Sequence, residues 1–487
     1  MSDRPSQSRL PLVETLVEYS RGGIYAFHTP GHKGGRFAPA QIEEMIGKLG
    51  LALDLPAMTV TDNTMHPTGC VRDAQLLAAE LFGAAETFFL TAGSTLGIAA
   101  AVLAAVPDGA TIVLPRNVHR SVTAALVLSG ARPRFLRHGV SPSCGALGVA
   151  PAELERALRE GPRPAAVLLT RPSYYGLTSE LEPLVEVCRA HQTPLIVDEA
   201  HGGHLHFLPP GHPRPALASG ADLVVQSSHK TLGSLVGTAQ LHVGLKSPID
   251  PARVRNALNL LQSTSPNYLL LASLDAARHN LWQSGPELFR QAVDDARELE
   301  DEIDRLPRMT VLRPDRDPRL AGHGRDPLRT VVNVSATGWK GFDVEVFLRT
   351  HWQVEDEMAD WFNIVLIQSP RDDPAARQRL LAGLRYVSEN PRDAKTGANV
   401  ELMQPPIPPL AMTPRQAALG RQEPVVVDQA VGRTCAEMVM FYPPGIPLLM
   451  PGETITPETL AVCRELLAGG AHCYASDVTL GTIRVTA

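Results

Sequence analysis

The sequence lacks a long apolar run, an excess of charge of one sign and an export signal. Its longest apolar run, Leu96–Val106, is too short to cross a bilayer, which needs about 20 residues. With 45 basic and 51 acidic residues the net charge is −6, so charge gives no reason to expect nucleic acid or an anionic membrane as a partner. Residues Met1–Pro5 lack the apolar segment of a secretory signal. We therefore expect a cytoplasmic protein.

The sequence is also poor in cysteine. Its six cysteines are scattered, and none forms a CxxC pair: Cys70, Cys144, Cys188, Cys435, Cys463 and Cys473. This spacing favours reduced thiols in a cytoplasmic protein over a disulfide framework or a zinc site. The run His201, His204 and His206 has ligand-like spacing, but no further ligands accompany it, so we expect no metal site.

What the sequence does contain is an alternation of short apolar runs and helical patterns after about Pro67. The expected strands are Thr87–Leu90, Thr111–Leu114, Ala166–Thr170, Leu195–Val197 and Leu223–Gln226. The expected helices are Gly69–Phe82, Leu96–Val106, His119–Ser129, Pro151–Glu160 and Leu181–His191. Continuously apolar strands separated by helices predict an α/β fold, with a mainly parallel sheet flanked by helices. Ligands of such sheets bind beyond the C-terminal ends of the strands.

The 487 residues are too many for one simple core, so several domains are expected. We predict an irregular N-terminal segment 1–65, a large domain 66–325, a small α/β domain 326–400 and a C-terminal domain 401–487. Within these we expect a charged helix over Pro286–Leu306 with Pro286 in its first turn. A Pro-rich linker is expected between Asn390 and Pro414, and a helix near Pro457–Leu467.

Two strand ends carry hydroxyl and acidic residues. The strand Thr87–Leu90 leads into Thr91–Gly97 (TAGSTLG), where Ser94, Thr95 and the backbone N–H groups of a helix start suit a phosphate. The strand Leu195–Val197 leads into Asp198, a buried acid that needs a partner. Helix capping is the alternative explanation for both segments.

A third strand end carries an amine. The strand Leu223–Gln226 leads into Ser227–Gly233 (SSHKTLG), where desolvation would lower the pKa of Lys230 and make it nucleophilic. A solvated surface lysine is the alternative. A pyridoxal 5′-phosphate (PLP) site needs a phosphate cradle, an acid for the pyridine nitrogen and a lysine for the aldehyde. The three segments together therefore predict a PLP enzyme with Lys230 as the Schiff-base lysine.

Seven segments, in order, extend this prediction over nearly the whole chain: Phe27–Gly35 (FHTPGHKGG), Thr91–Gly97, Pro115–Ser121 (PRNVHRS), Val197–Gly202 (VDEAHG), Ser227–Gly233, Ser263–Tyr268 (STSPNY) and Tyr442–Glu453 (YPPGIPLLMPGE). With them the chain resembles the ornithine/lysine/arginine decarboxylase family, in the aspartate-aminotransferase fold (fold type I) of PLP enzymes. The length is similar to the short form of the family, without an N-terminal wing domain. The sequence departs from the family pattern at Thr61–Pro67, a segment expected to border the active site, which leaves the choice of substrate open there.

The resemblance implies roles for residues around the cofactor. Asp198 would pair with the pyridine nitrogen, His119 would stack on the ring, Ala200 would pack on its other face and His201 would lie close by. The phosphate would be held by Ser94, Thr95 and Ser228 and, from the neighbouring subunit of a homodimer or larger homo-oligomer, by Thr264 and Ser265.

The resemblance also implies decarboxylation of a basic amino acid, as in polyamine biosynthesis. Arginine, giving agmatine, is the first expectation; lysine or ornithine is the second, and an aminotransferase on the same fold is the third. His229 or Lys230 would return a proton to Cα. Glu453 is the candidate to bind the cationic end of the substrate, and a structural glutamate at a helix start is its alternative.

Overall fold

The chain folds as two units, each built from several segments. The structure is a computed structural model that describes residues 5–137, 139–141, 145–146, 148–393, 407–442 and 445–487. Unit 1 comprises Met1–Ala105, Pro194–Phe207 and Arg214–Gly285, and unit 2 comprises Val106–Thr193, Leu208–Pro213 and Pro286–Ala487. Cys144, most of the predicted linker and the two prolines of the YPPG segment lie outside the described residues.

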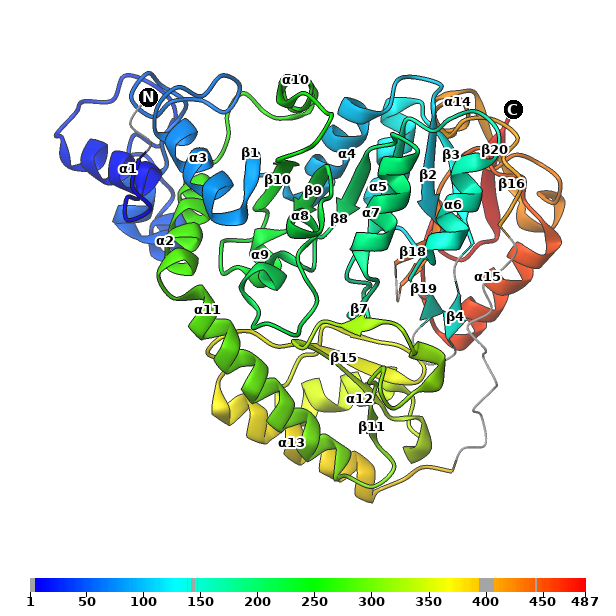
Figure 1. Ribbon diagram of the computed structural model, residues 1–487. Helices are drawn as coiled ribbons and strands as arrows, with labels where there is room; N and C mark the ends of the chain where they lie inside the picture. Colours follow the sequence, from blue (N-terminus) through cyan, green and yellow to red (C-terminus); the bar gives the residue numbers. More distant parts are fainter. Residues whose placement is uncertain (1–4, 138, 142–144, 147, 394–406, 443–444) are drawn as a thin grey trace. The chain divides into compact units, whose positions relative to one another are not determined.

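Unit 1 combines strands and helices from three parts of the chain, coloured blue to green in Figure 1. In chain order its elements are α1 (Pro11–Arg21), α2 (Ala40–Leu53), α3 (Cys70–Phe82), β1 (Ala84–Leu90), α4 (Gly93–Ala105), β8 (Leu195–Asp198), η1 (Gly203–Phe207), α8 (Ala216–Ser219), β9 (Leu223–Gln226), α9 (Ser228–Thr231), β10 (Ala239–Gly244) and α10 (Pro251–Leu261).

The strands of unit 1 are hydrogen-bonded in the order β1-β10-β9-β8. Strand β10 runs antiparallel to both β1 and β9, and β8 runs parallel to β9. Strands β1, β9 and β8 therefore share one direction, and their C-terminal ends lie at the same edge. Helix α4 packs closely on this sheet at Gly97, where an added Cβ would lie 2.7 Å from Val225 and 2.8 Å from Leu90.

The prediction of an irregular segment up to residue 65 is wrong in part, because α1 and α2 both lie there. Helix α1 begins at Pro11 and buries Leu12 and Leu16, which join a core with Tyr268 and Leu271. Contacts with residues distant in the sequence thus stabilise a helix that the local pattern of apolar residues is too short to predict. The segment Phe27–Gly35 is a loop, as expected.

The predicted helix Pro286–Leu306 is also wrong in its start. Helix α11 spans Tyr268–Asp304, and Pro286 lies inside it rather than in its first turn. A proline removes one helical hydrogen bond and usually ends a helix. Here the turns on both sides are anchored by apolar side chains, among them Leu281 and Phe289, which are 3% and 1% exposed.

Unit 2 begins with a second set of strands and helices. Strand β2 (Thr111–Pro115) pairs in parallel with β3 (Arg132–Leu136) and with β6 (Ala166–Thr170). The helices of this part are α5 (Arg120–Ser129), α6 (Pro151–Arg159) and α7 (Leu181–Ala190). The short strands are β4 (Val140–Ser141), β5 (Gly145–Ala146), β7 (Leu177–Thr178) and β12 (Gly324–Arg325).

The rest of unit 2 contains two further cores. The first has the sheet order β11-β13-β15-β14, and its elements are β11 (Thr310–Val311), β13 (Arg329–Asn333), α12 (Gly341–Phe347), β14 (Met358–Ala359), β15 (Asn363–Ile367) and α13 (Pro374–Glu389). Figure 1 shows α13 beside the C-terminal half of α11, and Arg377 pairs with Glu302 there. The second contains α14 (Pro414–Leu419), β16 (Gln422–Val426), β17 (Val439–Tyr442), β18 (Ile446–Leu449), α15 (Pro457–Gly469), β19 (His472–Tyr474) and β20 (Thr482–Thr486).

The predicted fold class is confirmed: the chain is α/β, and parallel pairing dominates among the strands that the helices flank. The domain boundaries at 65, 325 and 400 stay a prediction. Within the described part of the chain, no helix has both the length and the apolar character that a membrane span requires.

Candidate active site

Three loops of unit 1 meet at one edge of its sheet. They follow β1, β8 and β9, the strands that share one direction. The register places Leu90 opposite Ala239, and Gln226 opposite the next residue, Gln240. Asp198 is the parallel partner of Val225. The sequence therefore brings its hydroxyl, acidic and amine segments together as predicted from the strand ends.

The hydroxyl segment lies at the start of α4. Ser94 Oγ accepts a hydrogen bond of 2.9 Å from Ser227 Oγ, which links the loops after β1 and β9. Thr95, next to it, is exposed. The first-turn N–H groups of a helix have no partners within the helix, so this corner offers donors and hydroxyls to an anion. Ser227 was not among the predicted site residues, although its place in the SSHK segment points to it.

The acidic residue, Asp198, is the last residue of β8 and is 4% exposed. Its Oδ1 accepts a 3.2 Å hydrogen bond from the backbone N–H of Ala200. Burial raises the pKa of the Asp198 carboxyl to about 6, while the Ala200 N–H and the Lys230 ammonium act in the opposite direction. A buried carboxyl in this state is stabilised as an anion by any cationic partner.

The amine, Lys230, lies in α9 and is partly buried. Its Nζ is 2.8 Å from Nε2 of His201. When Lys230 is an ammonium it can only donate, so His201 accepts on Nε2 and carries its own proton on Nδ1. His201 therefore contacts the amine of Lys230, while its predicted place beside the cofactor ring stays a prediction.

His229 and Ser228 flank the lysine with defined partners. The Nδ1 of His229 lies 2.6 Å from the carbonyl oxygen of Thr238. A carbonyl only accepts, so Nδ1 holds a hydrogen and Nε2 is the atom that gains or loses a proton. Ser228 is 1% exposed, and its Oγ accepts a 3.1 Å hydrogen bond from Gln240.

Thr264 and Ser265 lie apart from these groups, exposed in the loop between α10 and α11. The neighbouring segment Thr61–Pro67 is held by Asp62, whose carboxylate accepts backbone N–H groups from both sides of the loop, including Gly69 at 2.8 Å and Thr68 at 3.0 Å. Gln262 also donates to the Thr64 carbonyl at 3.4 Å. The segment that departs from the family pattern is therefore an ordered loop beside Thr264.

His119 and Glu453 belong to unit 2. His119 caps α5, with Nδ1 accepting from the Ser121 backbone N–H at 3.2 Å, and it is exposed. Glu453 is 0% exposed, and its Oε2 accepts from Arg116 at 2.9 Å and from the Met450 N–H at 2.7 Å. Burial raises the pKa of the Glu453 carboxyl and Arg116 lowers it. This placement favours the structural alternative, and substrate contact by Glu453 stays a prediction that its burial weighs against.

Histidine pairs elsewhere have partners of their own. His28 contacts the Tyr19 hydroxyl at 2.8 Å, and His32 contacts Asp54 at 3.0 Å. His206 stacks near Phe82, with ring centroids 5.3 Å apart. Among the residues that the structure describes, no group of three His, Cys, Asp or Glu side chains is placed to hold a metal ion.

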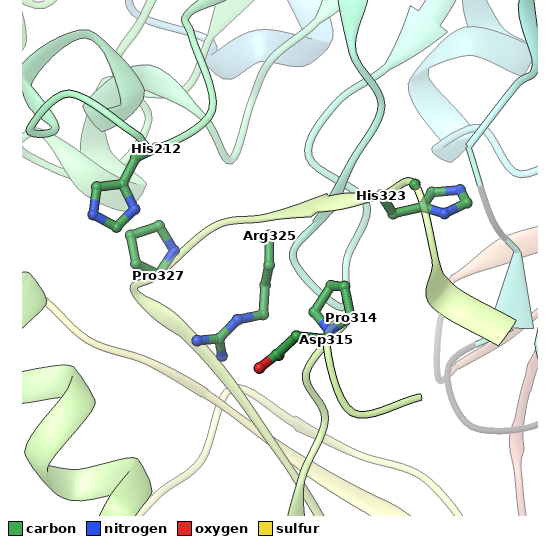
Figure 2. Close-up of a pocket in the computed structure, with 7 residues that line it drawn as sticks. His212, Pro314, Asp315, His323, Arg325 and Pro327 are labelled. Atoms are coloured by element: carbon green, nitrogen blue, oxygen red, sulfur yellow. The ribbon is translucent and has the colours of Figure 1, made fainter. Parts of the chain in front are cut away.

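Unit 2 also contains an open hollow of about 450 Å³, shown in Figure 2. It is lined by His212, Pro314, Asp315, Gly322, His323, Arg325 and Pro327. The Arg325 guanidinium binds the Glu300 carboxylate, with 2.9 Å between Nη2 and Oε2, and Nε2 of His323 accepts the Gly148 N–H at 3.2 Å. Arg325 and His323 thus have structural partners, and the lining of the hollow includes none of the predicted site residues.

The donor set of unit 1 fits PLP. Hydroxyls at a helix start suit its phosphate, and the buried Asp198 carboxyl suits a protonated pyridine nitrogen. Lys230, in the loop after the neighbouring strand, supplies an amine for its aldehyde. The fold and these residues define a PLP-dependent enzyme of fold type I.

Comparisons with known proteins agree. Residues 10–344 match the model of the Orn/Lys/Arg decarboxylase major domain, and residues 398–470 match that of its C-terminal domain. An arginine decarboxylase of Halalkalibacterium halodurans is 36% identical over 98% of both chains. One of Bacillus subtilis is 35% identical over 99% of this chain and 98% of its own. The constitutive lysine decarboxylase structure of Escherichia coli, at 21% identity, has a TM-score of 0.84 and covers 98% of this chain and 82% of its own, which shows the fold.

The chain therefore belongs to the Orn/Lys/Arg decarboxylase family and is a PLP-dependent amino-acid decarboxylase. This confirms the resemblance, the enzyme class and the cofactor predicted from the sequence.

Proposed function

We propose that the protein decarboxylates L-arginine to agmatine and CO₂, in the cytoplasm, as a step of polyamine synthesis. The observation that carries the substrate is the full-length similarity to arginine decarboxylases, at 35–36% identity over 94% or more of this chain. Lysine and ornithine are the alternatives, because the family model covers all three and its lysine decarboxylase members are 24% identical to this chain.

The residues of unit 1 would hold the cofactor as follows. Lys230 would bind its aldehyde, Asp198 would keep a proton on its pyridine nitrogen, and Ala200 would contact one face of the ring. Ser94, Thr95 and Ser228 would bind the phosphate, and the Ser94–Ser227 hydrogen bond supports this because it orients both hydroxyls at one corner. His119 of unit 2 is proposed for the other ring face.

When bound, PLP supplies an electron sink for the charge that develops at Cα. The protein's own contribution would be to orient the substrate so that the bond to its carboxylate, rather than the Cα–H bond, is the one that breaks. Afterwards a proton must return to Cα. His229 Nε2 and Lys230 Nζ are the proposed donors, and His201 Nε2 would accept a proton from the lysine between turnovers.

A product assay tests this proposal. Purified protein with PLP is offered arginine, lysine and ornithine, and CO₂, the amine product and any 2-oxo acid are measured. We expect CO₂ and agmatine from arginine, with the other two at least about tenfold slower in kcat/KM, the lower end of the discrimination that a single missing group on the substrate gives. Lys230→Ala is the control. Stoichiometric 2-oxo acid, or near wild-type turnover by Lys230→Ala, would contradict the proposal.

We also propose a homodimer whose subunits complete each other's active sites. Thr264 and Ser265 are exposed in unit 1, so they are available to a second copy. Several large apolar side chains of unit 1 are exposed as well: Tyr25 (77%), Phe27 (98%), Phe37 (81%), Met45 (76%) and Leu49 (65%). Exposed apolar surface of this kind is typical of an interface. Light scattering at micromolar concentration should give twice the chain mass.

A further inference from the structure

Four buried polar side chains form one hydrogen-bonded chain across the sheet of unit 1. Thr87 Oγ1 lies 2.8 Å from His242 Nδ1, His242 Nε2 lies 3.2 Å from Gln226 Oε1, and Gln226 Nε2 donates to Glu199 Oε2 at 2.8 Å. All four side chains belong to residues that are at most 1% exposed. We call this set, Thr87, His242, Gln226 and Glu199, the polar chain.

Its hydrogen bonds have a single consistent direction. The Glu199 carboxylate accepts from the amide nitrogen of Gln226, so the amide oxygen accepts from His242 Nε2–H. Burial lowers the pKa of His242 to about 3, so the ring is neutral and its Nδ1 accepts from the Thr87 hydroxyl. Glu199 Oε1 also accepts the Ala216 N–H at 2.9 Å. The direction of each hydrogen bond is thus fixed by its neighbour, from the Glu199 carboxylate to the Thr87 hydroxyl.

The polar chain takes one member from each strand that ends in a cofactor loop. Thr87 is on β1, which leads to Ser94; Gln226 ends β9, directly before Ser227; Glu199 directly follows Asp198. The fourth member, His242, is on β10, which carries none of the predicted cofactor residues and lies between β1 and β9. His242 therefore adds a buried side-chain connection between β1 and β9, besides the Ser94–Ser227 hydrogen bond that joins the loops after them.

The polar chain lies on the face of the sheet opposite to α4 and to Asp198, which pairs with Val225. Val225 faces α4, since a Cβ on Gly97 would lie 2.7 Å from it, and Gln226 is the next residue along the strand. Successive side chains of a strand point to opposite faces. The aromatic rings of Phe82 and His242, with centroids 5.1 Å apart, cover the side away from α4.

We infer that the polar chain is a positioning device that fixes the register of the three loops, so that Ser94, Asp198 and Lys230 keep the spacing that PLP requires. Glu199 and His242 are then positioning residues that never touch the cofactor. The inference rests on the cofactor residues proposed above. A substitution that breaks a hydrogen bond of the polar chain should speed the release of PLP and lower kcat. It should leave KM for the substrate nearly unchanged.

Two isosteric variants test this. Thr87→Val removes the hydroxyl that donates to His242, and Thr330→Val, the matched control, removes a fully buried hydroxyl on β13 that bonds Glu300 at 2.9 Å. The rate of PLP release from each holoenzyme is measured without substrate, by absorbance after gel filtration, together with Tm, kcat and KM. We expect both variants to lose Tm, but only Thr87→Val to release PLP about tenfold faster, the effect of one unsatisfied buried polar group.

Glu199 supplies a rescue experiment. Glu199→Leu breaks the polar chain, whereas Glu199→Gln permits it to re-form with every bond reversed: the new amide donates to Gln226 Oε1, Gln226 donates to His242 Nε2, and His242 Nδ1–H donates to Thr87. We expect fast PLP release from Glu199→Leu and near wild-type release from Glu199→Gln.

Equal PLP release from Thr87→Val and Thr330→Val would overturn the inference, as would wild-type release from Glu199→Leu. If Glu199→Leu does not fold, the threonine pair decides alone. Failure of the wild type to bind PLP at Lys230 would instead refute the proposed function, so the two outcomes are distinct.

Discussion

Asp198 combines burial with a charge that its cofactor role would require. Asp198 is 4% exposed, its Oδ1 accepts the Ala200 N–H, and the Lys230 ammonium acts on it through its charge. Neither compensates fully for the loss of water, and the pKa of the carboxyl rises to about 6 from the ordinary 3.8. A cationic partner would therefore stabilise the carboxylate form of Asp198.

This predicts a pH-dependent stability of the apoprotein. Between pH 4 and 6 the Asp198 carboxyl of the folded protein keeps a proton that the unfolded chain has released. The free energy of unfolding is therefore unaffected by this group below pH 4, and it decreases by about 3 kcal/mol as the pH rises to 6. Asp198→Asn should lack this fall. Urea unfolding of both apoproteins at pH 4, 5, 6 and 7 measures it, and parallel pH profiles for the two proteins would contradict it.

At the scale of residues, the sequence predicted those whose chemistry is unusual at a strand end. Asp198, Lys230 and Ser94 follow buried strands, where a polar group needs a reason. Glu199, Gln226 and His242 were missed because their partners come from strands up to 155 positions apart, as Thr87 and His242 show. For Glu453 the sequence left a substrate role and a structural role open, because it does not show that the partner of its carboxylate is Arg116, 337 positions away.

At the scale of elements, the contact between α4 and its sheet positions the start of α4, which carries Ser94 and Thr95, the proposed phosphate ligands. Gly97 allows α4 to approach Val225 and Leu90, because a Cβ would meet them at 2.7 and 2.8 Å. Val225 and Leu90 are packed in the core, so displacing their side chains lowers the stability of the fold. A side chain at this position would therefore move the start of α4 away from the loops after β8 and β9.

Gly97→Ala should accordingly destabilise the protein by about 1–3 kcal/mol, as overpacking does, and weaken PLP binding. The matched control is Gly50→Ala in α2, where the added Cβ would meet Ile46 at an ordinary 3.4 Å. Thermal unfolding and PLP titration of both variants test the prediction. It fails if Gly97→Ala binds PLP as tightly as the control does.

Elements with strong local patterns were predictable and those stabilised from afar were not. The strands β6 and β9 have the predicted bounds, and α6 and α7 differ by one residue at the end. Helix α1 depends on a core that includes Tyr268, and α11 continues through Pro286 against the local rule. Antiparallel β10 (Ala239–Gly244) was missed as well, because Gln240 and His242 interrupt its apolar run, and sequence alone does not show that both are buried with hydrogen-bonding partners.

At the scale of the whole molecule, the proposal of a homodimer with shared active sites predicts the activity of mixed dimers. Lys230→Ala removes the amine, and Thr264→Ala/Ser265→Ala removes the hydroxyls proposed to reach the partner. A mixed dimer has one site with both defects and one with neither. Co-expression of the two variants with different tags should therefore restore about a quarter of wild-type activity, since half of randomly formed dimers are mixed and each has one intact site.

Each variant expressed alone should be far less active than the mixture. A dimer with self-contained sites would give no more activity on co-expression than the average of the two variants. Purification through both tags isolates the mixed species and makes the comparison quantitative.

The ion pair of Arg116 and Glu453 bears on how the gene could be divided. Arg116 lies in the segment that matches the major domain, and Glu453 lies in the segment that matches the C-terminal domain. Expression of residues 1–393 alone would leave a buried guanidinium without its carboxylate, at a cost of about 3–5 kcal/mol. A chimera between relatives therefore has to take both residues of the ion pair from compatible parents, and the two segments cannot be exchanged independently.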